Sequence, residues 1–252
     1  MMPPVKAIET RGLCKTFGGL MVADKVDFAL EAGARHALIG PNGAGKTSLV
    51  NMLTGAIPPS AGKIYLSGEE VTHLSGAARV HRGLARTFQI NTLFGELSAL
   101  DNVALAIAER RGIAWRLWRA ACRYREVHDE CMILLESLGL AADASRRVAD
   151  LDYGKQRLVE IAVALGLKPK VLLLDEPAAG VPSLESGRIL DVLDALPAEV
   201  AILIIEHDME LVFRFAQRIT VLVRGQILCQ GTPDEIAADA RVQEVYLGGE
   251  HG

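Results

Sequence analysis

The sequence has no long run of uncharged apolar residues. A helix that spans a bilayer needs about 20 such residues, and no stretch of the 252 residues reaches that length. The first twelve residues carry Lys6, Glu9 and Arg11 where a signal peptide would have an apolar core. We therefore expect a cytoplasmic chain whose contact with a membrane, if it has one, is peripheral.

Cysteines and paired histidines are also scarce. The four cysteines are widely separated and form no CxxC pair, and the six histidines form no HxxxH pair. Neither a zinc site, nor a thiol redox motif, nor a disulfide framework is indicated. The net charge of −4 gives no basic footprint of the kind that non-specific nucleic-acid binding needs. We expect a reduced chain that does not bind nucleic acid.

Internal repeats, low-complexity linkers and sustained heptads are absent as well. Half of the residues are hydrophobic, which is enough to fill a substantial core. From Ala7 to Leu30 the pattern is strand-like, and Gly18-Gly19 marks a turn, which predicts an antiparallel β edge. The apolar runs at 171–174 and 201–205 predict buried parallel strands, since parallel sheets are covered on both faces.

Helical patterns replace strand patterns between about Thr92 and Asp150. Near the end of the chain, Ile219–Val223 and Gln226–Cys229 predict a hairpin, and Thr232–Glu235 has the spacing of a capping box. We predict an α/β fold with a mainly parallel sheet. An N-terminal antiparallel β subdomain and an inserted helical subdomain at 92–150 would complete one domain over residues 5–252.

Residues 40–47 read Gly-Pro-Asn-Gly-Ala-Gly-Lys-Thr and match the GxxxxGKT phosphate loop. An apolar run at 37–39 precedes them, and a helical pattern from Ser48 to Thr54 follows. The glycines let successive backbone N–H groups turn toward phosphate oxygens, and the helix start adds a positive end. The alternative is a turn that only joins a strand to a helix, but it gives the Lys46-Thr47 ending no packing purpose. We expect a triphosphate as the ligand.

Two carboxylates, Asp175 and Glu176, follow the apolar run 171–174. The carboxyl ends of parallel strands are where α/β sheets bind their ligands. In phosphoryl transfer an acidic residue typically holds Mg²⁺, while a neighbouring side chain positions or polarises the attacking water. We assign Asp175 to Mg²⁺ and Glu176 to the water. The alternative for Asp-Glu-Pro is an ordinary turn with a helix-capping acid.

Five motifs occur in one order and spacing. They are Gly40–Ser48, Gln89 within Arg86-Thr87-Phe88-Gln89, Leu151–Gln156, Asp175-Glu176-Pro177, and His207 within Glu206-His207-Asp208. In this order they resemble the ATP-binding-cassette (ABC) ATPases, which have a P-loop NTPase core. The resemblance covers nearly the whole chain, which would make residues 5–252 one ABC ATPase domain.

The resemblance implies a role for each motif residue. Phe17 would stack on adenine, Ser48 would contact the α-phosphate, and His207 would contact the γ-phosphate. Thr47 and Gln89 would hold Mg²⁺, with Asp175 behind them. Glu176, His207, Gln89 and Lys46 would serve catalysis, and the nucleotide-binding residues would be Phe17, Gly40, Pro41, Asn42, Gly43, Ala44, Gly45, Lys46, Thr47, Ser48, Asp152, Tyr153, Gly154, Lys155 and Gln156. Each of three residues also has an alternative interpretation when it is taken without the motif order. Phe17 could be a core residue, His207 a structural residue, and Gln89 a solvated residue in a loop.

The segment Leu151–Gln156 is predicted to be a short loop that enters a helix at Arg157. In the resembling family this positive helix end faces the γ-phosphate bound by a second copy, so that two chains enclose two ATP molecules. Asp152 stands where the family usually has serine, and a carboxylate about 4 Å from a phosphate oxygen would be repelled by about 4 kcal/mol per unit charge. We therefore expect Asp152 to fold back onto the amides of its own helix, near Lys155. Pro182 similarly replaces an aspartate that bridges the two subunits in many members.

Several segments most closely resemble ATPase subunits of importers for branched-chain amino acids and related amides. They are Tyr153-Gly154, Glu176–Gly180, Glu206–Val212, Gly231–Pro233 and Val245–Gly248. The implied partners are a second cassette subunit, transmembrane permease subunits and, indirectly, a substrate-binding protein, at the inner face of the cell membrane. The alternative is a soluble cassette ATPase that acts as an assembly or scaffold factor. Chromosome-structure and repair ATPases would need long coiled coils.

One segment between 115 and 123 has the pattern of a basic amphipathic helix. Its two adjacent stripes are Arg116, Arg119 and Arg123, and Trp115, Trp118 and Cys122. Such a helix either buries its tryptophans within the subdomain, or lies beside anionic headgroups or a membrane subunit. Both hypotheses stay open.

Overall fold

The computed structural model describes residues 5–87, 93–113, 125–181 and 183–247. The chain divides into two compact units. The first unit comprises Met1–Leu84, Lys170–Glu176 and Pro197–Gly252, and the second comprises Ala85–Pro169 and Pro177–Leu196. Among the described residues, no helix has both the length and the apolar composition that crossing a membrane requires.

The first unit begins with an antiparallel sheet, as predicted for the N-terminal segment. Its strands are β1 (Lys6–Phe17), β2 (Leu20–Val26), β3 (Ala29–Glu31), β5 (Ala61–Leu66) and β6 (Glu69–Glu70). β1 is central, because it pairs with β2 around the Gly18-Gly19 turn and also with β3 and β5. Ile8, Leu30 and Ile64, one from each of three paired strands, are buried in the core.

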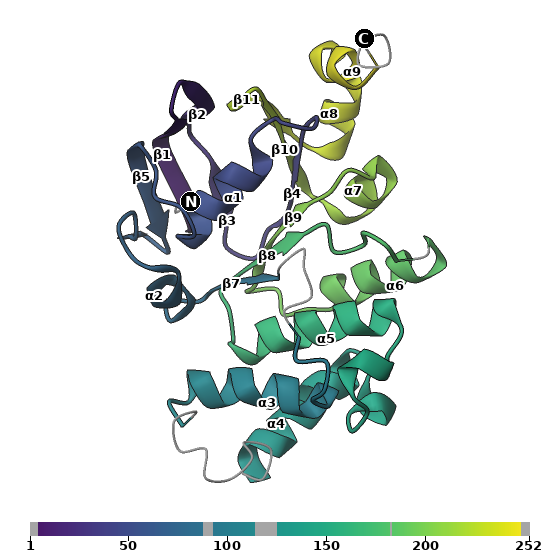
Figure 1. Cartoon of the computed structure of the whole chain (residues 1–252). Helices are drawn as coiled ribbons and strands as arrows, with labels where there is room; N and C mark the ends of the chain where they lie inside the picture. Colours follow the sequence, from purple (N-terminus) through teal and green to yellow (C-terminus); the bar gives the residue numbers. More distant parts are fainter. Residues whose placement is uncertain (1–4, 88–92, 114–124, 182, 248–252) are drawn as a thin grey trace. The chain divides into compact units, whose positions relative to one another are not determined.

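A second sheet in the first unit has the strand order β11-β10-β4-β9-β8 (Figure 1). Its parallel members are β4 (Arg35–Ile39), β8 (Val171–Asp175), β9 (Ala201–Ile205) and β10 (Arg218–Val223), and β11 (Gln226–Gly231) forms a hairpin with β10. All residues of β4, β8 and β9 are buried, which explains their continuous apolar sequences. Ile205 is in register with both Leu38 and Asp175. The carboxyl ends of these three strands therefore meet at one edge.

The strand β7 (Leu84–Thr87) begins at Leu84, where the first segment of this unit, Met1–Leu84, ends. The helices of the first unit are α1 (Lys46–Thr54), α2 (Gly76–Val80), α7 (Met209–Phe215), α8 (Pro233–Ala238) and α9 (Ala240–Leu247). α8 starts with the predicted capping box, in which Thr232 and Glu235 each accept a backbone N–H of the other. The predicted parallel strands, the hairpin and this helix start are confirmed.

The second unit is built mainly from helices. They are α3 (Ala99–Arg110), α4 (Arg125–Ser137), the short 3-10 helices η3 (Ala141–Asp143) and η4 (Val148–Asp150), α5 (Tyr153–Gly166) and α6 (Ser183–Asp194). α3 packs against both α4 and α5, and α5 also contacts α6 (Figure 1). The predicted amphipathic segment at 115–123, with its tryptophans and arginines, lies outside the described residues.

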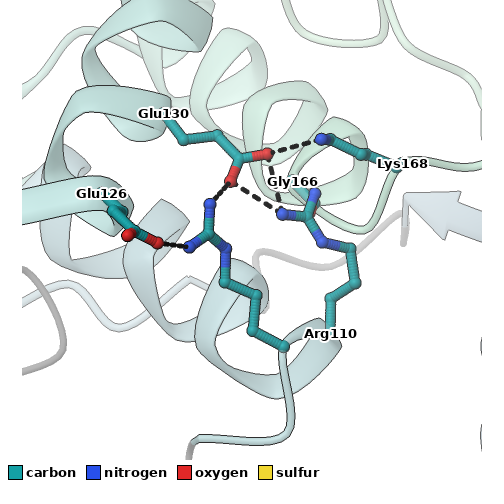
Figure 2. Close-up of polar contacts among 6 residues, drawn as sticks. Arg110, Glu126, Glu130, Gly166 and Lys168 are labelled. Carbon is teal, nitrogen blue, oxygen red and sulfur yellow. Dashed lines mark hydrogen bonds and ion pairs between the residues drawn. The ribbon is translucent and has the colours of Figure 1, made fainter. Parts of the chain in front are cut away.

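Glu130, within α4, links the C-terminal ends of α3 and α5 (Figure 2). Its carboxylate accepts hydrogen bonds from Arg110 at 2.7 Å and from Arg111 at 2.8 Å, and Lys168 lies 3.1 Å away. Arg110 also donates to the carbonyl of Gly166 at the end of α5. Partial burial raises the pKa of Glu130, but the hydrogen bonds from these cations outweigh it and lower that pKa to about 2. The cluster joins α3, α4 and the end of α5.

Candidate nucleotide site

The predicted phosphate loop links the end of β4 to the start of α1, and its shape requires glycine at two positions. A Cβ on Gly40 would collide with the carbonyl oxygen of Leu222, and one on Gly45 would collide with that of Val22. Gly45 also has a φ of 102°, which side-chain-bearing residues rarely adopt. The β10–β11 turn supports the loop from outside, since Gly225 N–H donates to the Ala44 carbonyl at 2.8 Å.

Lys46 is the first residue of α1 and is only 7% exposed. Its ammonium donates to the carbonyls of Gly40 at 2.6 Å and Pro41 at 3.1 Å. Burial lowers the pKa of Lys46, while the carboxylates of Glu176 and Asp175 raise it. No side chain caps the start of α1 and no acidic residue lies in its first turn. The amides there suit an anion, because the end of the helix dipole is positive.

A buried arginine supports the other end of α1. Arg79 of α2 is 1% exposed, and its guanidinium donates to backbone carbonyls rather than to a carboxylate. The acceptors are Met52 at 2.6 Å, Leu53 at 2.6 Å, Thr72 at 3.0 Å and Leu74 at 3.2 Å. Burial lowers the pKa of Arg79. Two of these carbonyls belong to the last turn of α1, so Arg79 fixes the helix that carries Lys46.

The two carboxylates lie at the carboxyl end of β8, as predicted: Asp175 is its last residue and Glu176 follows it. Asp175 is 5% exposed. Glu176 follows with a φ of 48°, a left-handed conformation that costs a non-glycine residue about 1–3 kcal/mol, and its N–H donates to the Ile205 carbonyl at 2.9 Å. Its carboxylate lies 2.7 Å from Nε2 of His207, just beyond the end of β9. The imidazole can donate to this carboxylate when it is protonated or when Nε2 carries the hydrogen.

The remaining predicted ligands of the first unit lie at the surface. Phe17 ends β1 with 49% of its surface exposed, and the Lys15 ammonium lies 4.8 Å from its ring centroid. Thr47 is exposed and Ser48 is half-buried in the first turn of α1. Gln89 lies outside the described residues.

The donors available suit Mg²⁺ bound together with phosphates. Thr47 in the first turn of α1 offers a hydroxyl, and Asp175 at the end of β8 offers a carboxylate, both hard oxygen ligands. The described residues contain no group of three or more His, Cys, Asp or Glu side chains that could enclose an ion. Mg²⁺ is commonly bound this way, by one or two carboxylates with phosphate oxygens and water. The chemistry of these residues therefore fits the implied ion.

In the second unit, Asp152 caps α5. Its carboxylate accepts the Lys155 backbone N–H at 2.8 Å, and the Lys155 ammonium lies 3.6 Å from the same side chain and 3.0 Å from Asp143. The prediction that Asp152 folds back onto its own helix near Lys155 is confirmed. The prediction of a loop through Gln156 is wrong, because the helix already begins at Tyr153. An N-cap residue fixes the helix start directly after itself.

The other residues of this segment have different surroundings. Gly154 is buried, and Gln156 donates to the carbonyls of Val148 at 3.2 Å and Leu151 at 3.0 Å. The Tyr153 ring is 37% exposed and lies against Gly180, where an added Cβ would come within 3.1 Å of it. A cavity of about 90 Å³ opens beside the helix start. It is lined by Asp152, Gly154, Lys155, Leu158, Arg188 and Ile189.

Comparison with known proteins places this geometry in a family. A sequence model described as "ABC transporter" matches residues 23–179, from within β2 past Glu176. The chain belongs to the ABC transporter family. It is therefore an ATPase that serves transport. A second model, described as "Branched-chain amino acid ATP-binding cassette transporter", matches residues 226–252.

Individual proteins agree with the ABC assignment. The chain is 37% identical to the high-affinity branched-chain amino acid transport ATP-binding protein BraF of Pseudomonas aeruginosa, over 96% of this chain and 97% of that protein. It is 37% identical to LivG of Escherichia coli K12, with the same coverage. Among solved structures, the ADP conformation of an ATP-binding cassette of an ABC transporter has a TM-score of 0.85 and 30% identity, covering 96% of this chain and 99% of that one.

Sequence reasoning missed Arg79 and the support that Gly225 gives to the phosphate loop. Gly225 was recognisable only as part of a hairpin turn, and Arg79 lies in a segment without any motif. Both act through backbone carbonyls, which accept from any suitably placed donor. No spacing of residue types could therefore have indicated them.

Proposed function

We propose that this chain hydrolyses ATP to power an importer of branched-chain amino acids or related amides. The C-terminal match to the branched-chain family model carries this proposal, because it adds to the general ABC match. The names of BraF and LivG, both relatives over nearly their whole length, also support transport over a soluble assembly factor. The chain would act at the inner face of the cell membrane with permease subunits and, indirectly, a substrate-binding protein.

The site residues suggest how hydrolysis proceeds. Glu176 would accept a proton from the attacking water, and His207, 2.7 Å away, would hold that carboxylate in place while it also faces the γ-phosphate. Lys46 would exchange its loop carbonyls for phosphate oxygens. Thr47 and Asp175 would hold Mg²⁺, with Gln89 as the further ligand that the resemblance implies. When bound, the ion neutralises negative charge on the phosphates.

The second half of each site would come from a second cassette subunit. The start of α5 presents a positive helix end, and Asp152 is already engaged by the Lys155 amide. Because the Lys155 and Gln156 N–H groups are taken by Asp152, the backbone at Tyr153 and above all at Gly154 would meet the γ-phosphate bound by the partner. Phe17 would stack on adenine through its exposed ring.

Uptake measurements test the transport proposal. Cells that lack this chain should lose high-affinity uptake of labelled leucine, isoleucine and valine. The wild-type chain should restore that uptake, and the Glu176→Gln variant should not. Affinity purification from solubilised membranes should also recover permease subunits. Unchanged uptake together with purely soluble partners would contradict the proposal and favour the assembly-factor alternative.

A further inference from the structure

The first residue of α5 contacts a buried arginine that lies one turn further along the same helix. The Arg157 guanidinium lies 5.3 Å from the centroid of the Tyr153 ring, within the range of a cation–π contact. The two residues are four apart, so their side chains share one face of the helix. Arg157 is 3% exposed, whereas Tyr153 is 37% exposed. The contact therefore connects a buried position to the exposed start of α5.

Glu160, at the next turn of α5, fixes this guanidinium. Its carboxylate accepts a hydrogen bond from Arg157 at 2.7 Å, and both side chains are almost fully buried. A buried ion pair adds little net stability, because taking both charges out of water costs about as much as their attraction returns. In the described part of the chain, Oε1 of Glu160 also has no hydrogen-bond partner, which reduces the gain further. The pair therefore contributes a fixed position for the guanidinium rather than stability.

The Tyr153 ring has a second neighbour in the same unit, the turn at 178–181. Gly180 in this turn has a φ of 75°, and a Cβ added to it would come within 3.1 Å of the ring. The turn is closed by the Val181 N–H, which donates to the Ala178 carbonyl at 3.1 Å. A glycine at this point leaves room for the ring. The guanidinium and the turn together fix the ring, and with it the first residue of α5.

We infer that Arg157 is a positioning residue for the ATP-dependent pairing of two subunits, because it holds the Tyr153 ring and so steadies the amides of Tyr153 and Gly154. The inference rests on the proposed function, in which these two amides meet the γ-phosphate bound by the partner. The first N–H groups of a helix have no partner within the helix, so side-chain anchors decide how well they are held. Asp152 anchors the backbone of this turn, and Arg157 anchors its first side chain. An anchored helix start binds the phosphate without a further ordering cost.

The test is the double variant Arg157→Met/Glu160→Met in the full-length Glu176→Gln protein. It removes both buried charges and keeps most of their volume, so it should unfold at the same urea concentration as its parent or at a higher one. A cation–π contact contributes a factor of about 5 to an equilibrium, and a dimer contains two copies, so we expect the dimer dissociation constant with ATP to rise about 25-fold. Analytical ultracentrifugation measures that constant. Calorimetry below the dimer concentration should give an unchanged Kd for ATP, because the phosphate loop is untouched.

Arg110→Met is the matched control for a structural effect. Arg110 also pairs with a glutamate of the second unit, Glu130, but it contacts the opposite end of α5, at the Gly166 carbonyl. Its loss should lower the urea concentration at which the protein unfolds and leave the dimer constant as in the parent. Stability and dimerisation should therefore change independently of each other in the two variants.

A mutant cycle with Tyr153→Leu shows whether Arg157 acts through the ring. Tyr153→Leu should weaken the dimer at least as much as the double variant does, and the triple variant should be no weaker than Tyr153→Leu alone. A double variant that dimerises like its parent, effects that add in the triple variant, or a double variant that unfolds at much lower urea would each overturn the inference. A parent protein that does not dimerise with ATP would instead contradict the proposed function, so the two failures can be told apart.

Discussion

The carboxylate of Glu176 lies 2.7 Å from Nε2 of His207, across the ends of two parallel strands that are in register. Glu176 holds a left-handed backbone conformation at this point, which places its side chain beside the histidine. Backbone strain that persists in a folded protein commonly marks a functional position. The pair therefore joins the carboxylate that we propose handles the attacking water to the histidine that we propose faces the γ-phosphate.

We predict that Glu176→Gln binds ATP but hydrolyses it about 10² to 10⁴ times more slowly, the usual range for losing a group that handles a proton. The amide keeps the size of the side chain and can still contact His207. Because ATP persists, the variant should also accumulate an ATP-bound dimer, seen by size-exclusion chromatography. Wild-type turnover in this variant would show that the water-handling role is assigned to the wrong residue.

Asp152→Ser should strengthen ATP-dependent dimerisation. Serine still caps α5, but it removes a carboxylate whose charge faces the phosphates expected from the partner. Analytical ultracentrifugation in the Glu176→Gln background would measure the dimer constant with and without ATP. Asp150→Ser is the matched control, because Asp150 is paired with Arg147 and does not cap α5. A dimer constant that is unchanged or weaker in Asp152→Ser would contradict the argument.

His36 should make the fold sensitive to mild acid. Burial in β4 and the nearby Arg218 lower the pKa of His36 from 6.5 to about 4, and its Nε2 lies 2.8 Å from the Thr220 hydroxyl. As the pH falls, His36 therefore becomes protonated at a higher pH in the unfolded chain than in the folded protein. The free energy of unfolding should fall as the pH drops from about 6.5 to about 4, by about 3 kcal/mol at most.

Urea unfolding at several pH values tests the role of His36. The His36→Gln variant should lose the part of the pH dependence that lies between about 6.5 and 4, whereas His73→Gln, at an exposed position, should keep it. Carboxylates titrate in the same window, so the difference between variant and wild type is the quantity to compare. Identical slopes in all three proteins would show that His36 is not the source.

Arg79→Met should destabilise the first unit by about 3 kcal/mol, because several buried carbonyls would lose a shared donor. Methionine fills much of the same space, so the loss reports on hydrogen bonding rather than on a large cavity. Thermal and chemical unfolding would measure it. Arg82→Met, which breaks an ion pair at the surface with Glu69, should change stability by less than about 1 kcal/mol. Equal effects in the two variants would refute the distinction.

Local features of the fold were predictable from the sequence. The strand–loop–helix unit around Gly40–Thr47, the hairpin at Arg224-Gly225 and the capping role of Asp152 each depend on residues close together in the chain. The parallel strands β8 and β9 were recognisable because burial on both faces leaves only apolar residues.

Contacts between distant segments could not be predicted in the same way. Arg79 reaches the carbonyls at the end of α1 only after the segments that carry α1 and α2 have packed together. The pairing of Glu176 with His207 depends on the order and register of two strands that the sequence does not specify. The start of α5 was misplaced because Tyr153, Gly154 and Lys155 have no strong helical pattern and Asp152 alone sets the boundary.

Calorimetric titration of the intact protein with Mg·ATP tests the central claim most directly. Wild type should show a saturable heat of association at millimolar nucleotide. Lys46→Ala should lose most of this heat. The variant lacks the buried ammonium, which contacts the carbonyls of Gly40 and Pro41 and which we expect to bind the phosphates of ATP. An absence of binding heat in the wild type, or equal binding by wild type and Lys46→Ala, would contradict the account of the nucleotide site.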